Sequence, residues 1–183
     1  MSAEFGVRSE IRTPKVLYMP IIRPAEVRDA AALIEFMKAN EGEPNLMNEV
    51  GDFNLTLEAE RDWIKRFEDA PSSVYLVAEN NGRIVGSCGC HGGTRRVDEH
   101  VGSLGIAVHP DFRGQAIGTQ LLQAALDWAR SRDMRRVKLT VFARNDGAIR
   151  LYERFGFEIE GRHKNAICKR GELIDTLTMA KLL

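Results

Sequence analysis

The loop at residues 113–118, which lies between an apolar strand and an amphipathic helix, constrains the fold of this chain most. The apolar pattern of residues 101–108 predicts a buried strand, and Pro110 ends it because proline cannot donate to a sheet. The loop, RGQAIG, supplies a cation and two glycines, and the apolar spacing over residues 119–131 predicts a helix that opens at the loop. Free N–H groups at such a helix start attract an anion, so the loop predicts a phosphate site.

The loop differs from the two best-known phosphate signatures. The chain contains no GxxxxGK[ST] motif, and no GxGxxG follows the strand. An ordinary strand-to-helix turn therefore remains an alternative for this hexapeptide taken alone.

A second motif follows in LTVFARNDGAIRLYERFGF, residues 139–157. Alternating apolar residues over 137–142 predict a strand, and Asn145 or Asp146 can cap a short helix that ends before Gly156. Tyr152 places a hydroxyl on the apolar face of that helix, where a buried tyrosine normally has a hydrogen-bond partner. The alternative is a tyrosine with a purely structural role.

Together, the two motifs resemble those of the GCN5-related N-acetyltransferase (GNAT) superfamily, in particular small bacterial amino-acid and ribosomal-protein N-acetyltransferases. The family's acyl-CoA loop reads [QR]xxGx[GA], and here Ala116 stands where glycine is usual, a change that a negative φ would tolerate. The resemblance implies that acetyl-CoA is the cosubstrate. The cofactor-binding residues that it implies are Ile106, Ala107, Val108, Arg113, Gly114, Gln115, Ala116, Ile117, Gly118, Thr119, Asn145, Ala148 and Tyr152.

The resemblance also implies the chemistry. The backbone N–H near Val108 would hold the acetyl carbonyl, and Tyr152 would donate a proton to the departing sulfur. Many relatives place a glutamate on the strand before the loop, whereas this chain has Ser103, which we take as the second candidate catalytic residue. Other candidates for the general base, directly or through water, are Glu41, Glu43, Glu99, His91 and His100.

Composition limits the remaining classes of function. The chain has 183 residues and 44% apolar content, which predicts one domain. The resemblance implies that an acetyltransferase domain occupies residues 20–183, after an extension at 1–19. Its 26 basic and 26 acidic residues cancel, which argues against a dedicated nucleic-acid binder. No signal peptide or membrane-length apolar run is visible, so we expect a cytoplasmic protein without a membrane partner. Cys88 and Cys90 lack a second paired element, so we expect no metal site.

The remaining elements follow from periodicity and turn signals. Residues 16–23 predict a strand, Pro24 predicts a helix start, and residues 40–54 predict a loop. Thr56 predicts a cap for a helix with a buried stripe, and residues 80–82, NNG, predict a hairpin between strands 74–79 and 83–91. Two further strands are expected at 157–162 and 173–179. The stripe of the second helix is expected to comprise Leu57, Trp63, Ile64 and Phe67.

This element order also matches the family, which implies an α/β (α+β) GNAT fold. Its central sheet would be mixed and mostly antiparallel, flanked by helices, with two splayed strands that form the acyl-CoA cleft. We expect acetyl transfer to a primary amine of a small molecule such as an amino acid, by direct attack in a ternary complex. A protein N-terminal or polyamine acetyltransferase and a non-catalytic acyl-CoA sensor remain alternatives.

Two predictions concern binding partners. Residues 40–54 are acidic, and Glu41 and Glu43 are candidate residues for binding a cationic amine, although a solvated loop explains the charge equally well. The family often dimerises, and an apolar strand near the C-terminus would leave an edge that a second copy could cover. We therefore expect a homodimer.

Overall fold

The computed structural model describes residues 19–52 and 56–183, and within these ranges one seven-stranded sheet organises the chain. The order of the strands is β1-β2-β3-β4-β5-β7-β6, and every neighbouring pair is antiparallel except β4 and β5. The strands are β1 (Ile21–Pro24), β2 (Ser73–Asn80), β3 (Arg83–Gly92), β4 (Val101–Val108), β5 (Arg136–Phe142), β6 (Glu158–Lys169) and β7 (Glu172–Leu182). The expected mixed, mostly antiparallel sheet is thereby confirmed.

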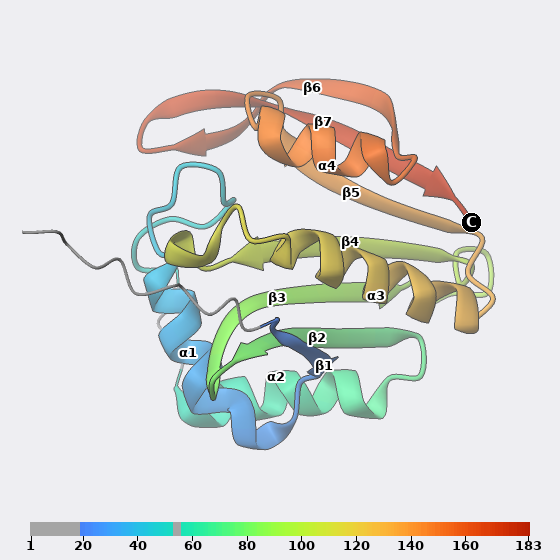
Figure 1. Cartoon of the computed structure of the whole chain (residues 1–183). Helices are drawn as coiled ribbons and strands as arrows, with labels where there is room; N and C mark the ends of the chain where they lie inside the picture. Colours follow the sequence, from blue (N-terminus) through green and yellow to red (C-terminus); the bar gives the residue numbers. More distant parts are fainter. Residues whose placement is uncertain (1–18, 53–55) are drawn as a thin grey trace, which may run out of the picture.

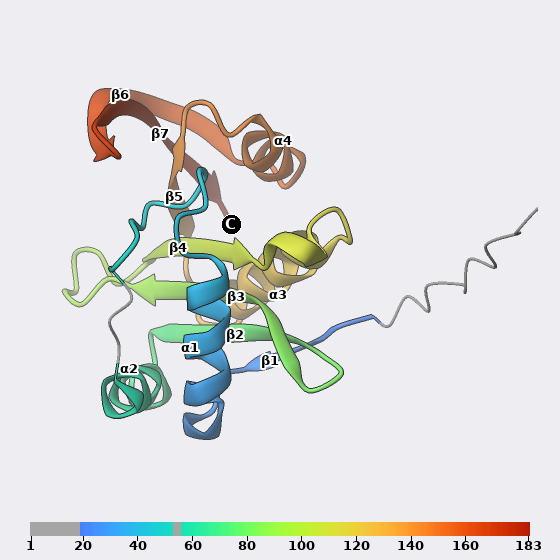
Figure 2. The same ribbon diagram turned by 90° about the vertical axis from the view of Figure 1, so that its left-hand side faces the viewer.

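Helices cover both faces of the sheet. The helices α1 (Ala30–Ala39) and α2 (Leu57–Asp69) lie on one face, and α3 (Ile117–Ser131) and α4 (Asp146–Arg154) lie on the other (Figures 1 and 2). Two buried apolar clusters correspond to the two layers, one built around α3 and the other around α1 and α2. Among the described residues, no helix is long and apolar enough to cross a membrane.

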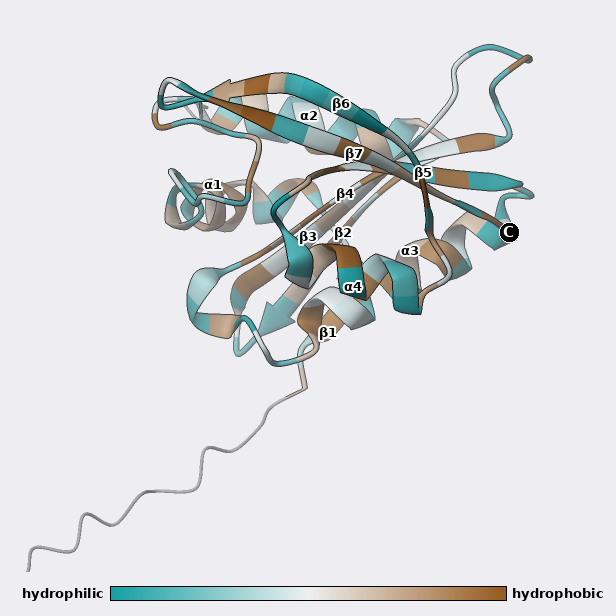
Figure 3. Ribbon diagram, turned by 90° about the horizontal axis from the view of Figure 1, so that it is seen from above, coloured by the Kyte–Doolittle hydropathy of each residue, from teal (hydrophilic) through white to brown (hydrophobic). Residues whose placement is uncertain are grey.

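Two tight turns, one of them predicted, hold the strands in register. Asn81 and Gly82 both have positive φ, 50° and 77°, which joins β2 to β3 by the tight turn that the NNG sequence predicts. Arg170 and Gly171, with φ of 51° and 78°, join β6 to β7 in the same way. Along β7, hydrophilic and hydrophobic residues alternate, as expected for a strand with two different faces (Figure 3).

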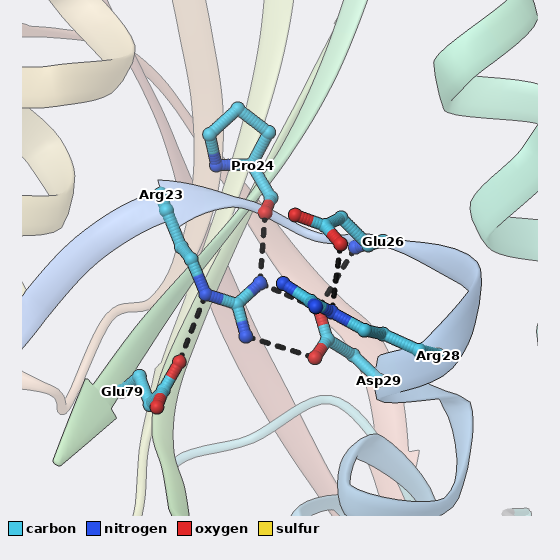
Figure 4. A network of polar contacts seen from close by, with 6 residues as sticks. All are labelled: Arg23, Pro24, Glu26, Arg28, Asp29 and Glu79. Atoms are coloured by element: carbon cyan, nitrogen blue, oxygen red, sulfur yellow. Dashed lines mark hydrogen bonds and ion pairs between the residues drawn. The ribbon is translucent and has the colours of Figure 1, made fainter. Parts of the chain in front are cut away.

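The prediction that Pro24 starts a helix is wrong. Pro24 ends β1, a short 3₁₀ turn follows at Val27–Asp29, and α1 starts at Ala30. Side chains fix this start: the Arg23 guanidinium donates to both carboxylate oxygens of Asp29, at 2.6 and 2.8 Å, and to Glu79 of β2 at 2.9 Å (Figure 4). This ion-pair network, which proline spacing does not reveal, sets the position of α1.

The predicted buried stripe of α2 is half wrong. Thr56 caps the helix as expected, accepting from the Ala59 N–H at 3.1 Å, but Trp63 is 42% exposed and Leu57 is 40% exposed. Glu60, which is 1% exposed, lies on the buried face together with Ile64 and Phe67. These three residues follow one another at intervals of about one helical turn. Burial raises the pKa of the Glu60 carboxyl to about 7.

The edge expected at the C-terminal strand is also placed differently. β7 is the C-terminal strand, and it pairs with β5 on one side and with β6 on the other. The edge strand at this end of the sheet is β6, most of whose residues are exposed and polar. The argument for a dimer from an apolar C-terminal edge therefore does not apply to this fold.

Candidate active site

The strands β4 and β5 separate halfway along their length. They pair in parallel only from Val101 to Leu104, and the second half of β4 has no partner on the side of β5 (Figure 1). The His109 N–H donates to the Val85 oxygen and so points toward β3. Successive N–H groups of a strand point to opposite neighbours, so those of the even-numbered residues of β4 point toward β5. The N–H groups of Ile106 and Val108 therefore point into the gap, where an extended ligand can pair with them.

The predicted phosphate loop lies at the open end of this gap. The helix α3 begins at Ile117, two residues earlier than predicted, so Ile117 and Gly118 belong to its first turn. The N-cap residue is Ala116, whose side chain cannot accept a hydrogen bond, and the first helical bond is donated by Gln120. The N–H groups of Ile117, Gly118 and Thr119 thus have no side-chain cap and are available to an anion.

The condition under which alanine at position 116 would be tolerated, a negative φ, is not met. Ala116 has φ 59° and ψ 12°, the left-handed region, in which a Cβ costs about 1 kcal/mol relative to glycine. Gly114 also has positive φ, 74°, and a Cβ there would meet no other atom within 4 Å. The backbone of the loop therefore keeps the left-handed conformation of a glycine position although residue 116 is alanine.

Arg113 connects this loop to the other side of the gap. Its Nε donates to the Val108 oxygen at 3.2 Å, and its Nη1 donates to the Glu43 carboxylate at 2.5 Å. Glu43 lies in the segment between α1 and α2, so the predicted phosphate-binding cation is paired with a predicted acceptor-binding carboxylate. The predicted sites for cofactor and acceptor thus share one ion pair.

The second motif supplies the wall opposite the loop. Asn145 caps α4, its Oδ1 accepting from the Ala148 N–H at 3.2 Å, which leaves its amide nitrogen as a donor. Tyr152, 7% exposed, packs beside Phe157, and its hydroxyl makes no hydrogen bond to another described residue. Burial raises the pKa of Tyr152 to about 12, so the phenol keeps its proton at neutral pH and can donate it.

The face of the sheet that α1 and α2 cover is open where β4 and β5 separate. Ser103 and Gly105 are exposed on this face of β4, and a Cβ on Gly105 would meet no atom within 4 Å. His91 of β3 is the cross-strand neighbour of Ser103, and Gly89 is that of Gly105. The predicted catalytic Ser103 therefore lies beside a histidine that was one of the candidate bases.

The segment between α1 and α2 is tied across the open end of the gap to the β6–β7 turn (Figure 2). The Lys169 ammonium, 4% exposed, donates to the carbonyl oxygens of Glu43 at 2.6 Å, Asn48 at 2.8 Å and Leu46. Burial lowers the pKa of Lys169. Sequence reasoning missed this lysine, because its partners are backbone carbonyls more than a hundred residues away.

The remaining candidates lie elsewhere or are engaged. Glu41 accepts from the Gly51 N–H. Glu99 and His100 line a cavity of about 570 Å³ at the end where β4 and β5 are still paired, away from the gap. Cys88 and Cys90 are fully buried, and burial raises the pKa of both thiols. The described residues hold no cluster of three or more His, Cys, Asp or Glu side chains that could bind a metal.

Comparison with known proteins agrees with this geometry. The sequence matches the Acetyltransferase (GNAT) family over residues 33–157. It is 30% identical to an L-amino acid N-acetyltransferase of Escherichia coli over 88% of this chain and 97% of that protein. The fold superposes on a GNAT acetyltransferase from Streptococcus pneumoniae with TM-score 0.85 and 30% identity, covering 90% and 99% of the two chains.

A third relative acts on a protein substrate. It is a ribosomal-protein-alanine N-acetyltransferase from Brucella melitensis, with 28% identity, TM-score 0.79, and coverage of 89% of this chain and 99% of that one. The resemblance found in the two sequence motifs is confirmed, and so is the expectation of an enzyme that transfers an acyl group. This chain belongs to the acetyltransferase (GNAT) family.

Proposed function

We propose that this protein transfers the acetyl group of acetyl-CoA to the primary amine of a small molecule, such as an amino acid, in a ternary complex. The observation that carries the proposal is the gap between β4 and β5, into which the N–H groups of Ile106 and Val108 point. The uncapped start of α3 lies at its open end, and the Tyr152 hydroxyl is available as a donor. These groups match the three parts of acetyl-CoA: a pantetheine arm, a pyrophosphate and a thioester.

The chain's own groups then account for each requirement of the transfer. The N–H groups of residues 117–119 and the Arg113 guanidinium bind the pyrophosphate, and the β4 backbone orients the arm. The Val108 N–H stabilises the negative charge that develops on the carbonyl oxygen. Tyr152 gives its proton to the thiolate as the carbon–sulfur bond breaks. Holding the amine and the thioester together removes much of the entropic barrier, so no covalent enzyme intermediate is needed.

The acceptor side favours a small amine over a folded protein. The segment between α1 and α2 bridges to the β6–β7 turn through Lys169 and through Arg170, whose N–H donates to Glu49 at 2.5 Å. This bridge links two parts of the chain that border the acceptor side, whereas a protein N-terminus needs an open groove. The amino-acid acetyltransferase that matches almost its whole length to this chain supports the same class of substrate. The amine of a protein N-terminus is the second candidate, supported by the ribosomal-protein relative.

The test is free-thiol release from acetyl-CoA with a panel of amino acids, spermidine and peptide N-termini, together with calorimetric titration of acetyl-CoA. We expect turnover with at least one amino acid and slower or no turnover with peptides. Turnover on peptides alone would replace the small-molecule acceptor by a protein. Tight binding of acetyl-CoA without turnover on any amine would support the acyl-CoA sensor, and absence of binding would overturn the proposal.

A further inference from the structure

The acceptor amine needs a base, and the face of the sheet opposite Tyr152 is where that base must lie. Tyr152 belongs to the apolar cluster around α3 and so occupies that side of the gap. An amine therefore reaches the gap from the side of α1 and α2, over Gly105. A Cβ on Gly105 would meet no atom within 4 Å, whereas Phe67, His91 and Tyr75 border the space over its cross-strand neighbour Gly89. Any base must therefore reach the open backbone of Gly105 from a neighbouring position.

The side chain of His91 extends toward this position. Its Nε2 lies 3.8 Å from the point that a Cβ on Gly89 would occupy, so the imidazole leans along β3 over Gly89. Gly89 is directly opposite Gly105, the first residue of β4 beyond its pairing with β5. The ring thus lies over β3, one strand away from the gap, in the row of the sheet at which β4 and β5 begin to separate.

Two aromatic rings of α2 hold the imidazole in place while one side stays accessible. The ring centroids of Phe67 and His91 are 4.4 Å apart, and those of Trp63 and His91 are 5.9 Å apart in an edge-on arrangement. His91 is nevertheless an exposed residue, so its ring is positioned without being sealed. A proton acceptor for an incoming amine must be fixed in position and accessible, and the His91 imidazole meets both requirements.

The surroundings of His91 also keep it neutral. Partial burial lowers its pKa, and no charged group contributes to this shift. Its neighbours among the described residues are Phe67 and Trp63 on α2, Ser73 on β2 and Ser103 on β4, none of which carries a charge. The nearest cation in the same row of the sheet, Lys138 of β5, lies beyond Ser103. At neutral pH the imidazole is therefore free to accept a proton.

We propose that His91 is the general base of this enzyme, its Nε2 accepting, through a bridging water molecule, the proton that the acceptor amine loses. This inference rests on the acetyl transfer proposed above and names the base for it. The amine nitrogen forms a bond to the acetyl carbon, and the carbon–sulfur bond breaks. One proton passes from the nitrogen to His91, and one passes from Tyr152 to the thiolate. Afterwards His91 releases its proton to solvent and Tyr152 regains one, so amine and thioester yield amide and thiol.

The test compares His91→Gln and His91→Ala with the wild-type protein, using the best amine from the panel. We expect kcat to fall about a hundredfold or more in both variants, because general bases contribute factors of this size. The calorimetric affinity for acetyl-CoA should change less than twofold. In the wild type, the acid limb of the plot of kcat/KM against pH should lie below the usual histidine pKa, and in both variants it should disappear. Added imidazole should restore part of the activity of His91→Ala.

The matched control is His100→Gln, a second exposed histidine, which directly precedes β4 and lines the separate cavity at the paired end of β4 and β5. It should leave kcat, acetyl-CoA binding and the acid limb unchanged. If His91→Gln keeps full activity and the same acid limb, His91 is not the base and the acetyltransferase assignment stands. If activity and acetyl-CoA affinity fall together without imidazole rescue, the role of His91 is structural. If wild-type protein turns over no amine, both proposals fail.

Discussion

The two sides of the gap between β4 and β5 differ in how the chain builds them. The cofactor side comes from two continuous stretches. Residues 106–119 are a strand end, a loop and a helix start, and residues 145–152 are a helix cap and the helix that follows it. The acceptor side brings together β3, β4, α2, the segment between α1 and α2, and the β6–β7 turn. A site for a constant ligand can be encoded locally, whereas a site for a specific amine is assembled from distant parts of the chain.

Gly118→Val should have the largest effect, and it should act on the cofactor side alone. A Cβ on Gly118 would contact Leu151 of α4 at 3.5 Å and Val108 of β4 at 3.8 Å, so a side chain here fills the space between the two walls. The β-branched valine adds two methyl groups where the cofactor must pass. We expect acetyl-CoA binding to weaken more than about a thousandfold in calorimetric titration.

Gly118→Ala is the control for this variant. Its single methyl group fits at ordinary contact distances, so the thermal unfolding midpoint should stay close to that of the wild type. The valine variant should also remain folded, as judged by circular dichroism. Unchanged acetyl-CoA affinity in folded Gly118→Val would mean that the ligand lies elsewhere, and the contrast between the two sides would fail.

The same contrast explains what the sequence could and could not predict. Strands and helices with clear periodicity, the Asn81–Gly82 turn and the caps at Thr56 and Asn145 follow from local chemistry, and the structure confirms them. The predicted start of α1 at Pro24 is wrong because the actual start depends on the ion pair between Arg23 and Asp29, which lie on either side of a turn. No local signal indicates that Lys169 binds distant carbonyl groups.

Tyr152→Phe should separate chemistry from binding on the cofactor side. The change removes only a hydroxyl that makes no hydrogen bond to another described residue, so the fold and acetyl-CoA affinity should be retained. Because burial raises the tyrosine pKa to about 12, the wild-type phenol can donate its proton throughout the neutral range. We expect kcat to fall roughly ten- to a thousandfold in the thiol-release assay. An equal fall in acetyl-CoA affinity would instead assign Tyr152 a structural role.

Glu60→Gln should show that the acceptor side carries a stability cost. Burial raises the pKa of Glu60 from its ordinary value of 4.5 to about 7, so the unfolded chain ionises first as the pH rises. The free energy of unfolding of the wild type should therefore fall between about pH 4.5 and 7, by up to about 3 kcal/mol relative to the variant. Urea unfolding at several pH values measures this difference.

Glu68→Gln, on the exposed face of the same helix, is the control, and it should give the same pH dependence as the wild type. If Glu60→Gln also follows the wild-type curve, the Glu60 carboxyl ionises normally and the inner face of α2 carries no such cost.

Glu43→Gln should have the smallest effect, and it tests the ion pair between Arg113 and Glu43, which joins the two sides. The Glu43 carboxylate competes with a phosphate for the Arg113 guanidinium, which it contacts at 2.5 Å. Both side chains are partly exposed, so the pair is worth about 0.2–1 kcal/mol. Removing the negative charge should therefore tighten acetyl-CoA binding, by about two- to fivefold at most, in calorimetric titrations at low salt.

Glu41→Gln separates the contact from the charge. Glu41 lies in the same segment but accepts from the Gly51 N–H and does not pair with Arg113, so its loss changes the net charge equally without freeing the guanidinium. Only Glu43→Gln should gain affinity, and the gain should shrink as salt screens the pair. Weaker binding in Glu43→Gln would mean that Glu43 holds the acceptor segment closed over the cofactor, in which case the two sides depend on each other more than their separate construction suggests.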